Sequence, residues 1–148
     1  MSVYNNDVYL GEAIESILAQ SFGDFEFLIL NDGSTDGSRA IIDDYAARDS
    51  RIRPIHRENK GLIVSLNELI EESRAPLIAR MDGDDVALPD RFAKQKAFLD
   101  AHPDHGMVGS WETLIGETGE PLGHGGEKTG SAGEMDANLA AGRRLAHP

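Results

Sequence analysis

Short apolar runs alternate with amphipathic segments along the first half of the chain, and this alternation constrains the fold more than any other feature. Residues 25–30, 52–56 and 77–81 read as strands, each followed by polar, turn-forming residues. Between them, residues 36–48 and 62–74 repeat apolar side chains at helical spacing. The order strand, helix, strand, helix, strand predicts an α/β fold with a mostly parallel sheet flanked by helices.

Further elements extend this pattern in both directions, and the 148 residues together suit a single domain. Before the first run we expect a helix, preceded by a strand that is cut short. Beyond residue 88 we expect a helix, another strand, a hairpin turn and a mobile Gly-rich loop. In chain order these predicted elements are Ser2-Val3-Tyr4 and residues 9–20, 89–99, 107–111, 117–120 and about 123–133.

Two polar turns follow predicted strands, namely Asn31-Asp32-Gly33-Ser34 and Asp82-Gly83-Asp84-Asp85. Ligands of parallel sheets bind beyond the carboxyl ends of the strands, so we expect both turns to face one cleft. The Asp32 carboxylate suits the imide N–H of a pyrimidine or the hydroxyls of a ribose. Asp82 and Asp84 offer the oxygen ligands that Mg²⁺ and Mn²⁺ prefer.

Each of these residues also has a structural alternative. Asp is favoured at turns and helix N-caps, so Asp84 or Asp85 would serve equally well as the cap of the next helix. Asn-Asp-Gly-Ser is ordinary turn chemistry. Lys60 is long enough to reach a diphosphate, but a lone loop lysine is more often a solvated surface group. Spacing alone leaves these alternatives open.

Composition excludes several classes of protein. The 14 Lys and Arg against 26 Asp and Glu give a net charge of −12, which repels a phosphate backbone, so we expect no nucleic-acid partner. The same acidity opposes a nucleoside diphosphate unless a divalent cation lies between the carboxylates and the phosphates. The absence of cysteine excludes disulfides and thiolate metal sites. Without a visible secretory signal or a long apolar run, the chain is expected to be cytoplasmic.

Taken together, the motifs resemble those of the family 2 glycosyltransferases, whose catalytic domains have the GT-A fold. The resemblance identifies the chain as the N-terminal, nucleotide-sugar-binding part of such an enzyme, truncated, with the Rossmann-like sheet incomplete at both ends. The segments that match in order and spacing are Ser2-Val3-Tyr4-Asn5, Phe27 to Asp36, Asn59-Lys60-Gly61, Ala79 to Asp85 and Leu88 to Phe92, followed by Val108 to Trp111 and Ala146-His147-Pro148.

The resemblance implies an inverting transfer of sugar from a UDP-, dTDP- or GDP-linked donor to a glycan or lipid-linked acceptor of unknown identity. It places Tyr4 and Asp32 against the base. Asp82 would face the ribose or the donor sugar, and Asp84 would hold Mg²⁺ or Mn²⁺ against the diphosphate. The implied nucleotide-sugar site is Tyr4, Asp32, Lys60, Asn67 and Asp82, and the implied metal ligands are Asp84 and Asp82. A metal site at this position suits the reaction, because breaking the sugar–phosphate bond places charge on the leaving diphosphate and a divalent cation neutralises that charge.

Inversion in one step also needs a carboxylate base for the acceptor hydroxyl. Family members carry that base in a Glu-Asp motif after the His-Pro segment, so we expect it beyond Pro148, in a parent protein that is cytoplasmic or at the membrane surface. One alternative is a non-catalytic module that binds a nucleotide sugar without turnover. Another is a sugar nucleotidyltransferase, which usually opens with a Gly-rich, basic phosphate loop that residues 4–7 lack.

Overall fold

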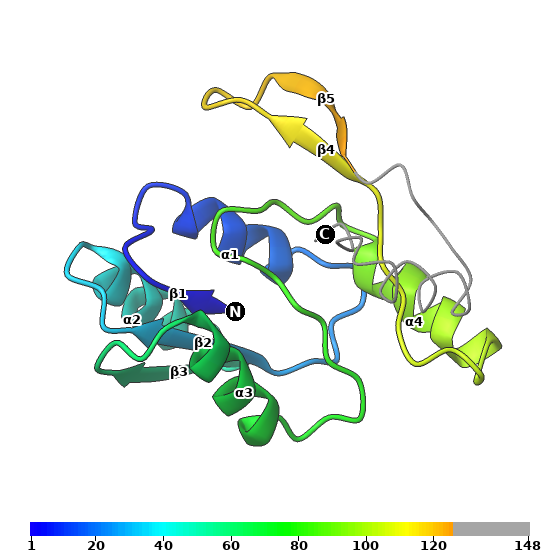
Figure 1. Cartoon of the computed structure of the whole chain (residues 1–148), viewed down its shortest axis with the longest axis horizontal. Helices are drawn as coiled ribbons and strands as arrows, with labels where there is room; N and C mark the ends of the chain where they lie inside the picture. Colours follow the sequence, from blue (N-terminus) through cyan, green and yellow to red (C-terminus); the bar gives the residue numbers. More distant parts are fainter. Residues whose placement is uncertain (126–148) are drawn as a thin grey trace, which may run out of the picture. The chain divides into compact units, whose positions relative to one another are not determined.

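A computed structural model describes residues 1–125, and the chain divides into two compact units, residues 1–93 and residues 94–148. The first unit contains a three-stranded parallel sheet in the order β1-β2-β3 (Figure 1). Its strands are β1 (Ser2–Val3), β2 (Phe27–Asp32) and β3 (Ile52–Arg57), and its helices are α1 (Leu10–Leu18), α2 (Ser38–Arg48) and α3 (Leu62–Glu72). The predicted parallel sheet with flanking helices is therefore confirmed in this unit.

Side chains of β2 alternate between two apolar clusters on opposite faces of the sheet. Phe27 and Ile29 pack in one cluster with residues of α1 and α2, whereas Leu28 and Leu30 pack in the other with Leu69 of α3. This alternation follows from the two-residue period of a strand. All six residues of β2 are buried, which explains why the strand reads as an uninterrupted apolar run before its polar end.

The strand predicted at residues 77–81 does not form. Leu77 and Ile78 are 46% and 58% exposed, and Met81 is the buried member of this segment. Its backbone pairs with the sheet at Asp82, just after the segment, in an isolated parallel bridge to Ser2 of β1. Because β1 is two residues long, it offers too short an edge for a further strand to pair with. The bridge nevertheless brings the acidic turn to the sheet.

Beyond the sheet, helix α4 (Arg91–Ala101) corresponds to the predicted helix over residues 89–99. The predicted strand at 107–111 is wrong, because the strand forms later, as β4 (Glu112–Ile115), and pairs antiparallel with β5 (Pro121–Gly125). The predicted hairpin turn at 117–120 is confirmed, since the Gly116 N–H donates to the Glu120 carbonyl at 2.8 Å. Residues 123–125 of the predicted mobile loop belong to β5, and residues 126–133 lie outside the described part.

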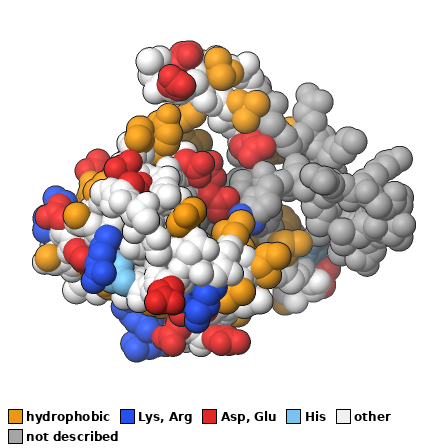
Figure 2. Space-filling model, turned by 60° about the vertical axis from the view of Figure 1, so that its left-hand side comes forward, with side chains coloured by type: hydrophobic (Ala, Val, Ile, Leu, Met, Phe, Trp, Pro, Cys, Tyr) orange, Lys and Arg blue, Asp and Glu red, His pale blue; other side chains and the backbone are white. Residues whose placement is uncertain are grey.

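Apolar side chains remain at the surface among charged ones (Figure 2). On α3 the exposed apolar residues include Leu62, Ile63 and Ile70, while Leu69 faces the sheet. Among the described residues, none of the helices combines the length and the apolar character needed to span a bilayer.

Candidate functional site

Four polar segments of the first unit meet at the carboxyl edge of the sheet, because parallel strands all end there. Residues 4–7 follow β1, residues 33–37 follow β2 and residues 58–61 follow β3. The acidic turn, Asp82 to Asp85, reaches the same edge through the bridge to Ser2. The two turns identified in the sequence therefore lie at one edge, as predicted, but the surface there is divided into two cavities.

The acidic cavity, with a volume of about 310 Å³, lies between the end of β1 and the acidic turn. It brings together three of the predicted site residues, Tyr4, Asp82 and Asp84. The Tyr4 side chain is 55% exposed, which leaves its ring available for stacking. The complete lining is Ser2, Tyr4, Asn5, Asn6, Leu62, Asp82, Gly83 and Asp84. Carboxylates, amides, an aromatic ring and an aliphatic wall suit a ligand that has both polar and apolar faces.

Arginines flank the acidic turn. The Arg80 guanidinium donates to both carboxylate oxygens of Asp82, at 3.1 and 3.0 Å. Arg91 donates to the Arg80 carbonyl at 2.8 Å. Burial lowers the pKa of Arg91, while the negative charges of Asp85 and Asp82 act in the opposite direction. The repulsion among the clustered carboxylates is thus relieved in part by positive charge within the chain.

The donor set of the acidic cavity fits a hard divalent cation. Asp82 and Asp84 supply carboxylate oxygens, and Asp84 is exposed to the cavity. Among the residues that the structure describes, no group of three or more metal-binding side chains is arranged around one point. Two carboxylates match the way Mg²⁺ is commonly held, with the remaining positions left to water and phosphate oxygens. A cation held by Asp82 would share that carboxylate with Arg80, which forms an ion pair with it.

Position 83, which lines the acidic cavity, is closely surrounded by side chains. A Cβ added to Gly83 would lie 2.9 Å from the Asn6 amide nitrogen and 3.7 Å from a Val3 methyl. This close approach explains the glycine between the carboxylates better than chain reversal alone, because Gly83 has no positive φ. Gly83 therefore lets the acidic turn pack directly against the loop after β1.

The loops after β1 and β2 are locked together by side-chain to backbone hydrogen bonds. Asn5 has a φ of 50° and accepts from the Thr35 N–H at 2.8 Å, while its own N–H donates to the Ser34 hydroxyl at 3.0 Å. Asp7 accepts from the Gly37 N–H at 3.0 Å. Sequence reasoning missed these roles, although Asn and Asp are the residues that commonly make such local bonds.

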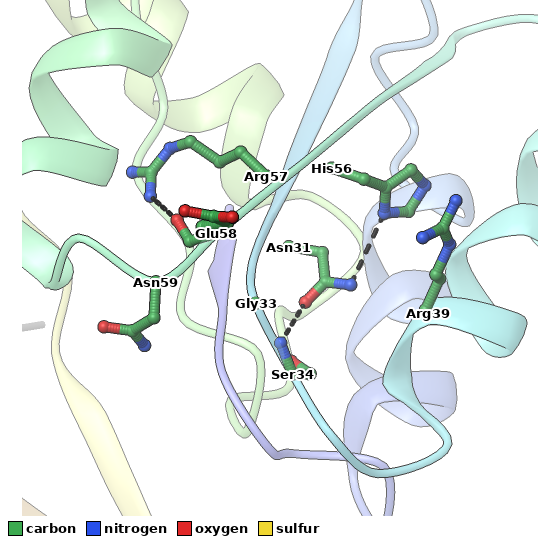
Figure 3. A pocket seen from close by; sticks show the side chains of 8 residues that line it. All are labelled: Asn31, Gly33, Ser34, Arg39, His56, Arg57, Glu58 and Asn59. Carbon is green, nitrogen blue, oxygen red and sulfur yellow. Dashed lines mark hydrogen bonds between the residues drawn. The ribbon is translucent and has the colours of Figure 1, made fainter.

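The polar cavity, with a volume of about 560 Å³, lies at the ends of β2 and β3 (Figure 3). The side-chain oxygen of Asn31, Oδ1, accepts from the Ser34 N–H at 3.0 Å, and its side-chain nitrogen, Nδ2, lies 3.4 Å from His56 Nδ1. His56 Nε2 lies 2.9 Å from an Asp43 carboxylate oxygen. The lining is Asn31, Gly33, Ser34, Arg39, His56, Arg57, Glu58 and Asn59. Apart from the turn at Asn31 to Ser34, sequence reasoning assigned none of these residues to a site.

The remaining predicted site residues lie away from the acidic cavity lining. Asp32 is 2% exposed, and its carboxylate accepts hydrogen bonds from the Lys60 and Gly61 N–H groups at 2.8 and 2.9 Å. Burial alone would raise the pKa of Asp32, but these bonds and the positive charge of Arg57 outweigh it and hold the pKa below its usual value. Lys60 is exposed at the turn, and Asn67 is exposed in the middle of α3.

Residues 1–136 match the family model described as "Glycosyl transferase family 2". The chain belongs to this family. EpsE of Bacillus subtilis is 42% identical over 121 residues, which is 80% of this chain and 44% of EpsE. The O-antigen biosynthesis glycosyltransferase WbnJ of Escherichia coli is 36% identical over 121 residues, which is 81% of this chain and 47% of WbnJ. The chain thus spans less than half the length of these relatives.

Among solved structures, residues 1–349 of TarS from S. aureus, in complex with UDP, match with a TM-score of 0.63. The sequence identity is 24%, and the match covers 69% of this family 2 chain and 31% of the TarS chain. At this identity the likeness shows the fold, which is the GT-A type that the motifs implied. The prediction of both family and fold class is confirmed.

Proposed function

We propose that the chain binds a nucleoside-diphosphate sugar in the acidic cavity and takes part in an inverting transfer of that sugar to an acceptor hydroxyl. The observation that carries the proposal is the convergence of Tyr4, Asp82 and Asp84 on one cavity at the carboxyl edge of the sheet. Membership of the glycosyltransferase family supplies the reaction class. UDP is the first nucleotide to test, because the TarS structure contains it.

In this proposal the aromatic and aliphatic walls hold the nucleoside. Tyr4, half-exposed after β1, stacks on the base, and Leu62 supplies an apolar wall of the same cavity. Asp82 accepts hydrogen bonds from ribose or donor-sugar hydroxyls while Arg80 keeps its carboxylate in place. Lys60 contributes positive charge from the neighbouring turn. Asn67, exposed on α3, is the remaining proposed donor-side residue.

Mg²⁺ or Mn²⁺ is the proposed cofactor, held by Asp84 and Asp82. A net charge of −12 and a cavity lined by two carboxylates disfavour an anionic diphosphate. When bound, the cation supplies neutralisation of the charge that develops on the leaving diphosphate. The chain's own residues orient the donor for in-line attack, which is the entropic part of the catalysis. We assign the general base to none of the described residues.

The acceptor class is proposed from the relatives. WbnJ is named for O-antigen biosynthesis, so a glycan or lipid-linked acceptor in polysaccharide assembly is the corresponding proposal for the protein that contains this chain. A non-catalytic nucleotide-sugar module would share the donor site but not the transfer.

Calorimetric titration of UDP, dTDP and GDP, each with Mn²⁺ and with chelator, tests donor binding. At least one nucleotide should bind with Mn²⁺ and bind much more weakly in chelator. Absence of binding by all three nucleotides in the presence of Mn²⁺ would overturn the proposed function. Binding without transfer from the corresponding nucleotide sugar in the full-length protein would favour the module instead.

A further inference from the structure

A network of side-chain hydrogen bonds links helix α2 to the ends of β2 and β3. Asn31 and His56 are partners in the parallel register, so their side chains lie on the same face of the sheet. His56 Nε2 lies 2.9 Å from a carboxylate oxygen of Asp43 on α2, and its Nδ1 lies 3.4 Å from Asn31 Nδ2. Asn31 is 3% exposed and the His56 side chain 19%, so water competes little for these bonds.

The position of the proton on His56 follows from the orientation of the Asn31 amide. Asn31 Oδ1 accepts from the Ser34 N–H, which turns Nδ2 toward the imidazole, as Figure 3 shows. The reversed amide would set its nitrogen against the Ser34 N–H, and two donors do not bond. Because Nδ2 can only donate, His56 Nδ1 accepts and carries no proton. The network is therefore complete when His56 is neutral and its proton is on Nε2, directed at Asp43.

The turn that Asn31 holds in turn holds the loop after β1. The Ser34 hydroxyl accepts from the Asn5 N–H at 3.0 Å, and the side-chain oxygen of Asn5 accepts from the Thr35 N–H at 2.8 Å. Asn5 has a φ of 50°, a left-handed conformation that a residue other than glycine keeps when its surroundings fix it. Tyr4 directly precedes Asn5 and lines the acidic cavity. The backbone that carries Tyr4 thus depends on the turn after β2.

We propose that His56 is a positioning residue for the donor site, acting through Asn31 on the loop that carries Tyr4. His56 does not line the acidic cavity, so its effect on the donor is indirect. The inference rests on the proposed function, which places the donor there. Neutral His56 accepts from Asn31, whereas a proton on Nδ1 sets two donors against each other and loosens the turn. Nucleotide affinity therefore falls as His56 becomes protonated.

Charged groups on two sides of His56 bear on its protonation. From α2, Asp43 faces Nε2, and Arg39 lies 3.7 Å from the other Asp43 oxygen. From β3 and the residue after it, Arg57 and Glu58 line the same polar cavity. The facing side chain of β2 is an uncharged amide. The two carboxylates favour the imidazolium and the two guanidinium groups oppose it, so the mismatch with the amide is the distinctive effect of protonation.

The variants His56→Gln and His56→Asn test this proposal, with His102→Gln as the control. The glutamine amide nitrogen takes the place of Nε2 and donates to Asp43, whereas the asparagine oxygen takes the place of Nδ1 and accepts from Asn31. His102 follows α4 and has no part in the network. UDP, dTDP and GDP are titrated with Mn²⁺ by calorimetry from about pH 8 to about pH 5.5, the range in which histidine ordinarily changes charge. Circular dichroism confirms folding at each pH.

In the wild-type protein and in His102→Gln, affinity should fall between these pH values by about 2–10-fold more than in either His56 variant, the size of one lost hydrogen bond. At pH 8, His56→Gln should bind more weakly by a similar factor, and its Ser34 amide should exchange faster than that of the wild-type protein. His56→Asn, which keeps the acceptor for Asn31, should restore most of the affinity. Nitrogen NMR of the imidazole should show the proton on Nε2.

The outcomes separate this proposal from the proposed function. The same pH dependence in the wild-type protein and both His56 variants, when the wild-type protein binds nucleotide, would overturn the positioning role and leave the function standing. A proton on Nδ1 of the neutral ring would overturn it as well. Because each His56 variant keeps one of the two hydrogen bonds, either variant alone is sufficient if the other does not fold. Failure of the wild-type protein to bind all three nucleotides would overturn both proposals.

Discussion

Substitution of Gly33 by alanine should destabilise the protein more than the same substitution at Gly61. Both glycines have positive φ, 74° and 88°, where a side chain costs about 1–2 kcal/mol. A Cβ at Gly33 would also lie 2.6 Å from the Asn59 backbone nitrogen, whereas a Cβ at Gly61 meets nothing within 4 Å. Backbone overpacking adds about 1–3 kcal/mol. We therefore expect losses of about 2–5 kcal/mol for Gly33→Ala and about 1–2 kcal/mol for Gly61→Ala.

Urea denaturation followed by circular dichroism measures both losses in the 148-residue protein. Gly23→Ala is the control, because Gly23 lacks a positive φ and an added Cβ meets nothing within 4 Å, so its stability should change little. Equal destabilisation by Gly33→Ala and Gly61→Ala would refute the close packing of the loop after β2 against the loop after β3. A loss of stability of the same size in the Gly23 control would show that neither positive φ nor close packing causes the destabilisation, because Gly→Ala at an unstrained position reduces the entropy of the unfolded chain and should not destabilise.

Three further predictions concern other parts of the first unit. Gln20→Ala should lower the free energy of unfolding by about 1–3 kcal/mol and speed hydrogen exchange of the Phe92 amide, because the buried side-chain oxygen of Gln20 accepts from that N–H at 3.0 Å. Unchanged exchange of the Phe92 amide would contradict this. Hydrogen bonds from Arg51 lower the pKa of Asp49 from 3.8 to about 2. The folded state therefore binds fewer protons than the unfolded state, so stability falls as the pH drops from about 4 toward 2. Asp49→Asn should make the free energy of unfolding depend less on pH in this range. The same pH dependence in the variant and the wild-type protein, measured by acid unfolding, would refute this. Tyr4→Ala should weaken UDP binding by about 1–3 kcal/mol in calorimetry while Tyr4→Phe retains it, and equal losses would argue against stacking.

Local periodicity predicted the elements that bury a regular face. β2 was predicted because an apolar run of its length is typical of a strand buried on both faces. Helices α1 and α3 were predicted because their apolar residues recur at helical spacing. The strands predicted at 77–81 and 107–111 failed because a strand also needs a pairing partner. The first meets a two-residue edge, and the hairpin turn places the second pairing at Glu112–Ile115.

The candidate site was predictable where it depended on position along the chain. Tyr4, Asp82 and Asp84 directly follow or meet the ends of strands, so topology alone brings them to one cavity. The burial of Asp32 was not predictable, because it depends on the register that pairs it with Arg57 and on the turn that covers it. Arg57 itself carries no local signal, since its partners lie in three different segments.

The effect of Mn²⁺ on UDP affinity in the variants Asp84→Asn and Asp85→Asn tests whether Asp84 holds a cation against the diphosphate. Asp84 lines the acidic cavity, whereas Asp85 is an exposed neighbour that does not line it, so the pair is matched in charge and local sequence. Calorimetric titrations with Mn²⁺ and with chelator give the metal-dependent gain in affinity for each protein. Asp84→Asn should lose most of this gain, and Asp85→Asn should keep it. Equal wild-type affinity in Mn²⁺ and in chelator, or an equal loss in the two variants, would contradict a cation held at Asp84.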